Sequence, residues 1–314
     1  MKQTKIAILL ATYNGEKYLR PLLESLFAQT EQDWQLLVSD DHSQDATPEI
    51  LEEYAARYPD RIRLLSYETA SGSSKANFLR LTSQAEGFPY LMYCDQDDVW
   101  KPDKIQKTLA CMQRLENGQP EVPCLVHTDL AVTDADLNVQ HESMFYSAWM
   151  DAKRCDLRYL LVQNVVTGCT MMINAALREL AMLPADTQGM LMHDWWYALW
   201  ASARGRIGFL PESTIFYRQH GDNAVGAKEV RNLRYLTSAF SRLDEHRQDL
   251  IATELQAAAF AQAATDYLTP EQRRMVTDFA RIRQKSKPGR LAVIFRHGIW
   301  LLGWKRKIGQ FLLI

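Results

Sequence analysis

The first third of the chain alternates between short apolar runs and stretches with the periodicity of a helix. The runs resemble strands buried on both faces, and they occupy residues 5–11, 34–39, 62–67 and 90–94. After the first run, apolar residues recur at helical spacing, at Leu19, Leu22, Leu23, Leu26 and Phe27. Three later helices are predicted. The first is capped by Thr47 with Pro48 at its first position, the second runs from residue 75 to about 84, and the third begins at Pro102. Four strand–helix units predict an α/β fold with a mostly parallel, doubly wound sheet.

The pattern changes after Gly118 and Pro120. Residues 125–132 alternate as a strand does, and an apolar run at 165–173 precedes a predicted helix at 174–182. A further helix is predicted from His193 and a strand at 214–217. Further along the chain, five apolar residues recur at helical spacing: Leu243, Leu250, Ile251, Leu255 and Ala258. They predict a helix face that packs in the core or against another subunit, as in a homodimer.

Three carboxylates, Asp95, Asp97 and Asp98, directly follow the apolar run at 90–94. The carboxyl ends of strands are where open α/β sheets bind ligands. Carboxylates this close repel one another unless a cation or hydrogen-bond donors compensate them. Mg²⁺ or Mn²⁺ bridging a nucleotide diphosphate is therefore the first expectation.

Other interpretations of this acidic cluster follow from the residues alone. The aspartates could serve only as turn and cap residues. An EF-hand loop is excluded, since Trp100 and Gln106 stand where it needs Gly and Glu. A DxDxV phosphatase with Asp95 as nucleophile fits the spacing. A dinucleotide-binding fold does not, because a single glycine follows the first strand.

Composition and charge narrow the function only slightly. The chain is 47% hydrophobic and 24% charged with a net charge of −2, which is typical of a folded protein and gives no indication of nucleic-acid binding. The five cysteines include no CxxC pair and predict buried, reduced thiols in a cytoplasmic protein. A strand within five residues of Met1 leaves no room for a signal peptide, and no apolar run is long enough to predict a membrane-spanning helix.

Six spaced motifs together resemble glycosyltransferase family 2, and more narrowly its bacterial rhamnosyltransferase-type members. They cover roughly residues 3–225 and read ATYNGEKYL, VSDDHSQDAT, YCDQDDVWKPDKI, TGCTMMIN, HDWW and YRQHG. The resemblance implies a GT-A fold for nucleotide sugars and an inverting, single-displacement transfer. It predicts a catalytic domain at 1–225, with a nucleotide-sugar half at 1–118 and an acceptor half at 119–225. Residues 226–314 would form a helical C-terminal region.

The resemblance also implies roles for individual residues. Tyr13 and Asp41 would hold the nucleobase, and Lys75 would pair with phosphate. Asp97 would contribute to both the nucleotide and the metal site, with Asp98 on the metal side and Asp95 supporting the loop or the ribose.

The catalytic base implied by the resemblance is Asp194, with His193 where the family usually has Glu. An inverting transfer needs one such carboxylate to take the proton of the acceptor hydroxyl. Beside it, Trp195 and Trp196 suggest an apolar wall for a sugar ring. Arg218 would contact the phosphate, and His220 the phosphate or the metal.

From Phe279 to the end, the chain has no acidic residue, and basic residues alternate with Trp, Phe and Leu. This pattern is typical of a helix lying in a membrane interface, here within 290–314, although packing on the protein or on a dimer partner would also explain it.

Taken together, the sequence predicts a glycosyltransferase at the inner face of the cell membrane. It would move rhamnose from dTDP-rhamnose to a polyprenyl-linked cell-wall or capsular polysaccharide. The alternatives are a UDP-hexose or UDP-N-acetylhexosamine transferase, the phosphatase, and a non-catalytic sugar-binding protein.

Overall fold

The computed structural model describes residues 5–183, 185, 187–220 and 243–314. The chain forms two compact units that interleave along the sequence. The first takes the described residues of 1–144, 167–180 and 206–226, and the second those of 145–166, 181–205 and 227–314. The sequence predicted boundaries at 118 and at 225; in the structure, residues 145–166 and 181–205 group with the C-terminal helices.

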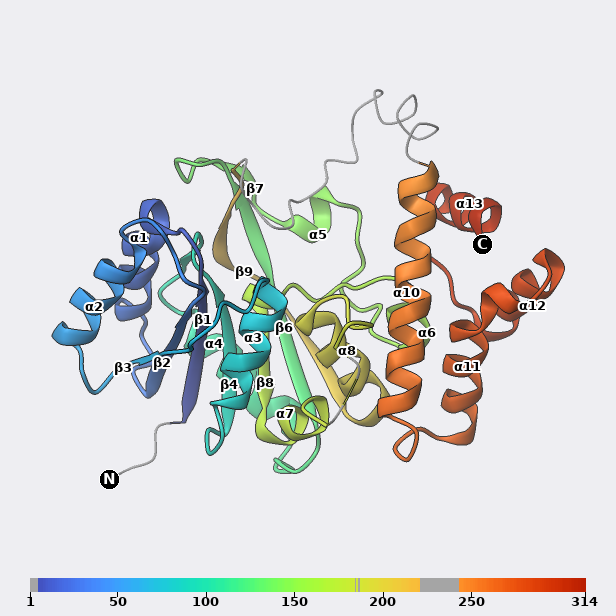
Figure 1. Cartoon of the computed structure of the whole chain (residues 1–314), viewed down its shortest axis with the longest axis horizontal. Helices are drawn as coiled ribbons and strands as arrows, with labels where there is room; N and C mark the ends of the chain where they lie inside the picture. Colours follow the sequence, from blue (N-terminus) through green and yellow to red (C-terminus); the bar gives the residue numbers. More distant parts are fainter. Residues whose placement is uncertain (1–4, 184, 186, 221–242) are drawn as a thin grey trace. The chain divides into compact units, whose positions relative to one another are not determined.

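A single sheet organises the first unit (Figure 1). Its strands follow the order β3-β2-β1-β4-β8-β6-β9-β5, with β7 paired to β6. The four strands expected from the apolar runs are present and parallel: β1 (Ile6–Thr12), β2 (Trp34–Asp40), β3 (Ile62–Leu65) and β4 (Tyr90–Asp95). β1 lies in the interior of the sheet, so almost all of its side chains are buried, as its unbroken apolar run predicted.

The other half of the sheet is mixed. It contains β5 (Val99–Trp100), β6 (Cys124–Thr133), β7 (Val139–His141), β8 (Met172–Asn174) and β9 (Arg206–Arg218). β8 runs antiparallel to both β4 and β6, whereas β9 runs parallel to β6. The apolar run at 165–173 is not one element, because a 3₁₀ turn at Gly168–Thr170 (η1) interrupts it and only its last two residues enter β8.

Helices follow the parallel strands as predicted, with small differences at their starts. The helices outside the C-terminal region are α1 (Glu16–Phe27), α2 (Thr47–Arg57), α3 (Ser74–Ser83), α4 (Lys104–Glu116), α5 (Met144–Ser147), α6 (Leu157–Leu160), α7 (Ala175–Ala181) and α8 (His193–Arg204). Thr47 does not cap α2: Ala46 takes that position, and the Thr47 hydroxyl accepts a hydrogen bond from the Gly15 amide at 2.7 Å. α4 begins at Lys104 rather than at Pro102.

The C-terminal part of the second unit is helical, as expected. It contains α10 (Leu243–Ala263), α11 (Pro270–Ala280), the 3₁₀ turn η2 (Ile282–Gln284), α12 (Lys287–His297) and α13 (Trp304–Leu313). The predicted stripe on α10 is wrong in part, since Leu255 is 59% exposed and Ala258 is exposed. Phe260 instead anchors α10, with its ring edge-on to Trp196 and Trp200 of α8. The Leu243 side chain lies outside the described residues.

Two further findings concern the cysteines and the length and apolar character of the helices. No disulfide joins any of the five cysteines, all of which lie in described residues. Within the described ranges, none of the helices combines the length and the apolar character needed to cross a membrane.

Asn174 joins three elements of the first unit at the end of β8. Its Oδ1 accepts hydrogen bonds from the amides of Cys124 and Leu177, at 2.9 and 3.1 Å. Its Nδ2 donates to Glu116 Oε1 at 3.0 Å and to the Val122 carbonyl at 2.8 Å. Because the residue is buried, these groups have no access to water once the amide is removed.

We predict that Asn174→Ala lowers the free energy of unfolding by about 3 kcal/mol, because it leaves several buried donors and acceptors without partners. Urea unfolding followed by circular dichroism measures this loss. The matched control is Asn138→Ala, whose amide bonds Asp134 at an exposed site and should cost less than about 0.5 kcal/mol. Equal losses for the two variants would contradict the junction role of Asn174.

Candidate active site

The ends of β1, β2 and β4 bring the predicted nucleotide-binding residues to one edge of the sheet. The register pairs Thr12 with Asp40 and Ala11 with Asp95, so Tyr13, Asp41 and the acidic cluster follow neighbouring strands. This edge is the carboxyl end of the parallel strands, the expected ligand position of such sheets.

Gln96, between the first two aspartates, ties the loop after β4 to the loop after β1. Its Oε1 accepts a hydrogen bond from the Tyr13 amide at 2.8 Å, and its Nε2 donates to the Tyr13 carbonyl at 2.9 Å. A Cβ at Gly15 would lie 2.4 Å from the same Oε1, so this contact requires glycine there. The Tyr13 ring is 57% exposed, as a stacking surface for a base must be. No role was predicted for Gln96 from the sequence, although it stands between Asp95 and Asp97.

Asp40, the last residue of β2, and Asp41, which follows it, have different contacts. Asp40 accepts hydrogen bonds from Thr12 Oγ1 at 2.8 Å and from the Ser43 amide at 2.9 Å, which shapes the loop. Asp41 accepts from the amides of Ser71 and Gly72, in the loop before α3. Asp41 thereby positions the start of α3, where Lys75 lies half-buried in the first turn.

The Asp98 carboxyl lies beneath the loop and is fully buried. Its Oδ1 accepts a hydrogen bond from the Arg218 amide at 3.3 Å, and it lies with Asp95 and Cys169 in a group whose ligand atoms are within 4.8 Å of one another. Burial, followed by repulsion from Asp97 and Asp95, raises the pKa of Asp98 well above its ordinary value. Burial likewise raises the pKa of the Cys169 thiol, and a protonated thiol is a poor ligand for Mg²⁺ or Mn²⁺.

Asp97 lies nearer the surface and pairs with His220. Its Oδ2 is 2.8 Å from His220 Nε2, and the two side chains are 15% and 14% exposed. The His220 ring also packs against Tyr18, with centroids 4.8 Å apart. The structure therefore joins the residues that the sequence placed in the DQDD and YRQHG motifs.

Arg218 fixes the acidic loop from the end of β9. Its Nε donates to the Asp97 carbonyl at 2.9 Å, its Nη1 donates to the Ala135 carbonyl, and its guanidinium lies 4.5 Å from the centre of the Tyr18 ring. The side chain is buried, and its described contacts are with the protein itself. These contacts give Arg218 a positioning role, and the phosphate contact expected from the sequence stays a prediction.

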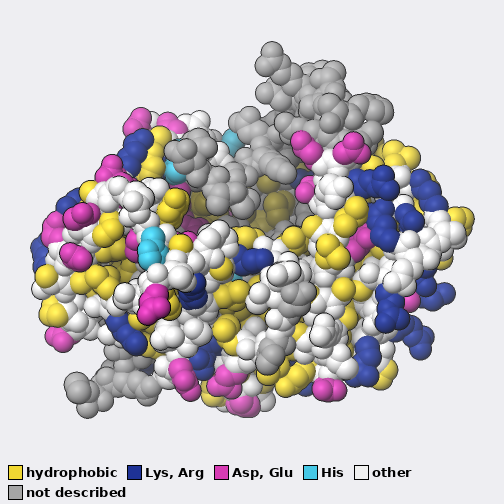
Figure 2. All heavy atoms as spheres, viewed as in Figure 1, with side chains coloured by type: hydrophobic (Ala, Val, Ile, Leu, Met, Phe, Trp, Pro, Cys, Tyr) yellow, Lys and Arg dark blue, Asp and Glu magenta, His cyan; other side chains and the backbone are white. Residues whose placement is uncertain are grey.

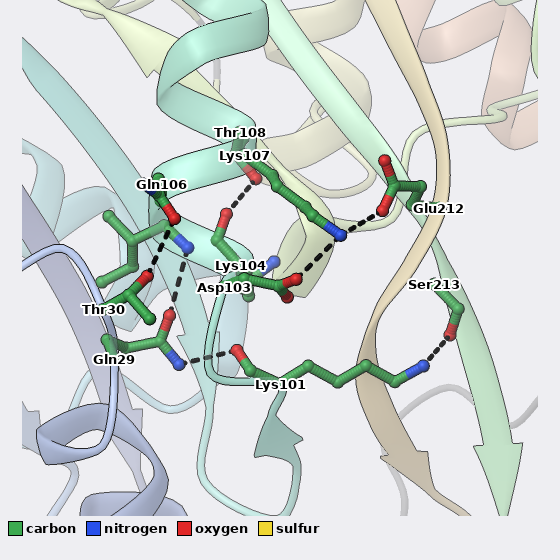
Figure 3. A network of polar contacts seen from close by, with 11 residues as sticks. Gln29, Thr30, Lys101, Asp103, Lys104, Gln106, Lys107, Thr108, Glu212 and Ser213 are labelled. Atoms are coloured by element: carbon green, nitrogen blue, oxygen red, sulfur yellow. Dashed lines mark hydrogen bonds and ion pairs between the residues drawn. The ribbon is translucent and has the colours of Figure 1, made fainter.

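The start of α4 is anchored from both sides (Figure 3). Gln29 accepts a hydrogen bond from the Ile105 amide at 3.1 Å and donates to the Lys101 carbonyl at 2.8 Å, while Lys101 Nζ reaches Ser213 of β9 at 3.3 Å. Lys104 is fully buried: its Nζ lies 3.3 Å from Thr214 Oγ1, and burial lowers its pKa to about 8.

The predicted base belongs to the second unit, in the first turn of α8. Asp194 is partly exposed, and its Oδ1 accepts a hydrogen bond from the Trp195 amide at 2.5 Å. Trp196 is fully buried with its Nε1 bonded to the Ala181 carbonyl, so it belongs to the core and the prediction of an acceptor contact was wrong for it. Trp195 is half-buried and donates to the Leu160 carbonyl at 2.6 Å, which leaves part of its ring available.

The residues of the acidic loop fit a hard divalent cation. Carboxylate oxygens and an imidazole nitrogen are ligands that Mn²⁺ accepts. Asp98 Oδ2 is buried and has no hydrogen-bond partner among the described residues, an arrangement that favours a nearby cation or proton.

Comparison with known proteins identifies the family. The model of the family described as glycosyl transferase family 2 matches residues 7–180. The dTDP-rhamnosyl transferase RfbG of Shigella flexneri is 27% identical over 248 residues, which are 77% of this chain and 82% of that protein. An uncharacterized protein of Mycobacterium bovis, Mb1547, is 31% identical over 68% of this chain, and that match spans only 59% of the relative.

Solved structures agree on the fold. TarS 1-349 of S. aureus in complex with UDP-GlcNAc superimposes with a TM-score of 0.56 at 17% identity, covering 94% of this chain and 93% of that one. GalNAc-T7 with UDP, GalNAc and Mn2+ superimposes with a TM-score of 0.53 at 12% identity, covering 85% of this chain and 55% of the other. The fold is the GT-A fold, as the sequence predicted.

His193 generates a prediction about acid stability. Burial lowers its pKa to about 3, whereas the unfolded chain has the ordinary value of about 6.5. Below pH 6.5 the unfolded state binds a proton that the native state excludes, so stability contributed by the neutral imidazole is lost as the pH falls. Between pH 7 and pH 5 this loss amounts to about 2 kcal/mol.

Urea unfolding at the two pH values measures the effect, and His193→Gln should reduce the difference between them by that amount. His141, which is less buried, provides the matched control as His141→Gln. An unchanged pH difference in His193→Gln would contradict the prediction.

Proposed function

The chain belongs to glycosyl transferase family 2, and from this premise we propose that it transfers rhamnose from dTDP-rhamnose to a saccharide acceptor. It is a glycosyltransferase with a GT-A fold. The similarity to the dTDP-rhamnosyl transferase RfbG over most of both chains is the observation that supports this donor. We propose a growing cell-wall or capsular polysaccharide on a polyprenyl carrier as the acceptor. Family membership sets aside the aspartyl-phosphatase and non-catalytic interpretations.

The donor would lie along the carboxyl edge of β1, β2 and β4. We propose that the exposed Tyr13 ring stacks on the nucleobase and that Asp41 accepts its ring N–H. For this, Asp41 must exchange at least one of the amide contacts it makes with Ser71 and Gly72. Lys75, in the first turn of α3, would pair with a phosphate, and Asp95 would hold the ribose.

Asp97 and His220 are the proposed direct ligands of Mn²⁺ or Mg²⁺. Their side chains meet and are both partly exposed, and to hold an ion they would have to give up the 2.8 Å contact between Asp97 Oδ2 and His220 Nε2. Asp98, which the sequence also assigned to the metal, lies fully buried below and would support the loop through the Arg218 amide. The ion would neutralise charge on the diphosphate as the bond to the sugar breaks.

Asp194 would act as the base. In an inverting transfer the acceptor oxygen attacks the anomeric carbon while the nucleoside diphosphate leaves from the opposite face. The carboxylate takes the hydroxyl proton as the new bond forms, so no covalent enzyme intermediate is needed. Asp194 lies in the first turn of α8, at the positive end of the helix dipole.

We predict that isothermal titration calorimetry finds metal-dependent binding of dTDP, and weaker binding of UDP and GDP. The enzyme should then hydrolyse dTDP-rhamnose slowly when no acceptor is present. A preference for UDP would replace rhamnose with a hexose or N-acetylhexosamine donor, as the alternative function requires. If none of the three nucleotides bound, the whole proposal would fail.

Two variants in the same titration separate the metal ligands from the loop support. Asp97→Asn should lower the dTDP affinity measured with Mn²⁺ by about tenfold or more and leave the metal-free affinity unchanged. Asp98→Asn keeps an oxygen that can accept from the Arg218 amide, so it should retain most of the metal effect. The reverse result would assign the ion to Asp98.

We predict that Asp194→Asn lowers turnover by about 10² or more, the scale of a general base, while the affinity for dTDP stays near that of the wild type. Initial rates with dTDP-rhamnose and isolated acceptor lipid measure the first quantity, and calorimetry the second. Asp151→Asn, at an exposed aspartate of the same unit, is the control. Retained turnover would remove Asp194 from the proposed role.

A further inference from the structure

The last helix, α13, exposes its apolar face. Four apolar residues, spaced four, three and one positions apart, make a stripe along one side of this helix, and we name it the α13 stripe: Trp304, Ile308, Phe311 and Leu312. Their exposed fractions are 69%, 51%, 42% and 58%. A helix at the surface of a globular protein normally turns such a stripe toward the core.

The opposite side of α13 is held by polar contacts. Gln310 is 1% exposed; its Oε1 accepts from the Leu301 amide at 2.9 Å, and its Nε2 donates to the Ile299 carbonyl at 2.9 Å. Ile314, also buried, ends the chain beside it. These contacts fix the rotation of the helix, so the α13 stripe cannot turn inward without leaving the Gln310 amide and its partners unsatisfied.

The apolar surface continues toward α12. Trp300 lines an open hollow of about 260 Å³ together with Lys307, Ile308 and Phe311. Its ring also meets the Phe295 ring edge-on, with centroids 5.0 Å apart, and Phe295 is 65% exposed. One continuous surface therefore includes the α13 stripe, Trp300 and Phe295.

Positive charge borders this surface. Lys305 and Lys307 are exposed on the two sides of the α13 stripe, and Arg296 is exposed beside Phe295. None of these three side chains forms an ion pair with a described residue, whereas Arg283 forms an ion pair with Glu254 at 2.9 Å. Figure 2 shows one side of this region, where Lys and Arg gather over the C-terminal helices with hydrophobic side chains between them. From residue 279 to 314 the chain has no acidic residue at all.

We propose that the α13 stripe, with Trp300 and Phe295, inserts into the interface of an anionic lipid bilayer. Exposed Trp, Phe and Leu flanked by Lys and Arg match the two attractions that such an interface offers, apolar burial and anionic headgroups. A second copy of the chain fits less well, because the facing surfaces would carry the same positive charge. The proposal depends on α12 and α13 alone, and therefore holds whichever donor the enzyme uses.

Flotation of the full-length protein with vesicles of phosphatidylglycerol and phosphatidylcholine tests the proposal. The wild type should bind these vesicles, and bind phosphatidylcholine alone far more weakly. Trp304→Ser should lower the partition coefficient by about tenfold, which corresponds to losing one buried aromatic side chain. Lys305→Gln and Lys307→Gln should each lower it by about fivefold and reduce its dependence on salt.

Trp149→Ser is the matched control, because Trp149 is 73% exposed but lies outside both helices. It should bind vesicles as the wild type does. Metal-dependent binding of dTDP in solution should be unchanged in Trp304→Ser, which separates failure of this surface from failure of the donor site. Equal vesicle binding by Trp304→Ser and the wild type would overturn the proposal. So would a wild-type dimer that Trp304→Ser dissociates, as measured by light scattering.

Discussion

The closely spaced carboxylates at the end of β4 impose the constraint on which the rest of the site depends. Asp95, Asp97 and Asp98 fall within four residues, and their repulsion would open the loop unless other groups held it. The restraints come from distant parts of the chain, through Gln96 to the loop after β1 and through Arg218 from the end of β9. β9 can supply Arg218 because it continues along β6 to the edge where the loop lies.

The first half of the fold could be predicted because its signals are local. Each of the four parallel strands appears as one apolar run and each helix as one periodic stretch, so the four strand–helix units were identified correctly, although β3 is an edge strand with two exposed residues. After residue 118 the local signals indicated β6, α7 and α8, but they did not indicate how the short strands and the C-terminal helices pack. β8 is three residues long and sits between strands distant in sequence, and α10 buries Glu254 and Gln256 while exposing Leu255. Hydrophobic periodicity cannot indicate which polar residues find partners in a core.

The candidate site, like the fold, could be predicted only in part from the sequence. The acidic cluster was visible because its residues are adjacent, and the structure places it at the expected edge of the sheet. The support for that cluster was not visible, since the hydrogen bond from Gln96 to the Tyr13 carbonyl spans 83 positions and the one from Arg218 to the Asp97 carbonyl spans 121. Trp196 shows the opposite error: an aromatic pair beside an acidic residue suggested a sugar platform, but one member fills the core.

The electrostatics of the loop explain why a metal ion belongs in the proposed function. Two basic side chains, Arg218 and Lys104, lie close to the acidic loop, and both are buried and bonded to protein atoms. Burial also lowers the pKa of Lys104 to about 8, which weakens its hold on the proton. This arrangement balances the carboxylates but leaves little positive charge for a diphosphate. A divalent ion at Asp97 and His220 would supply that charge at the rim, where those two side chains are partly exposed.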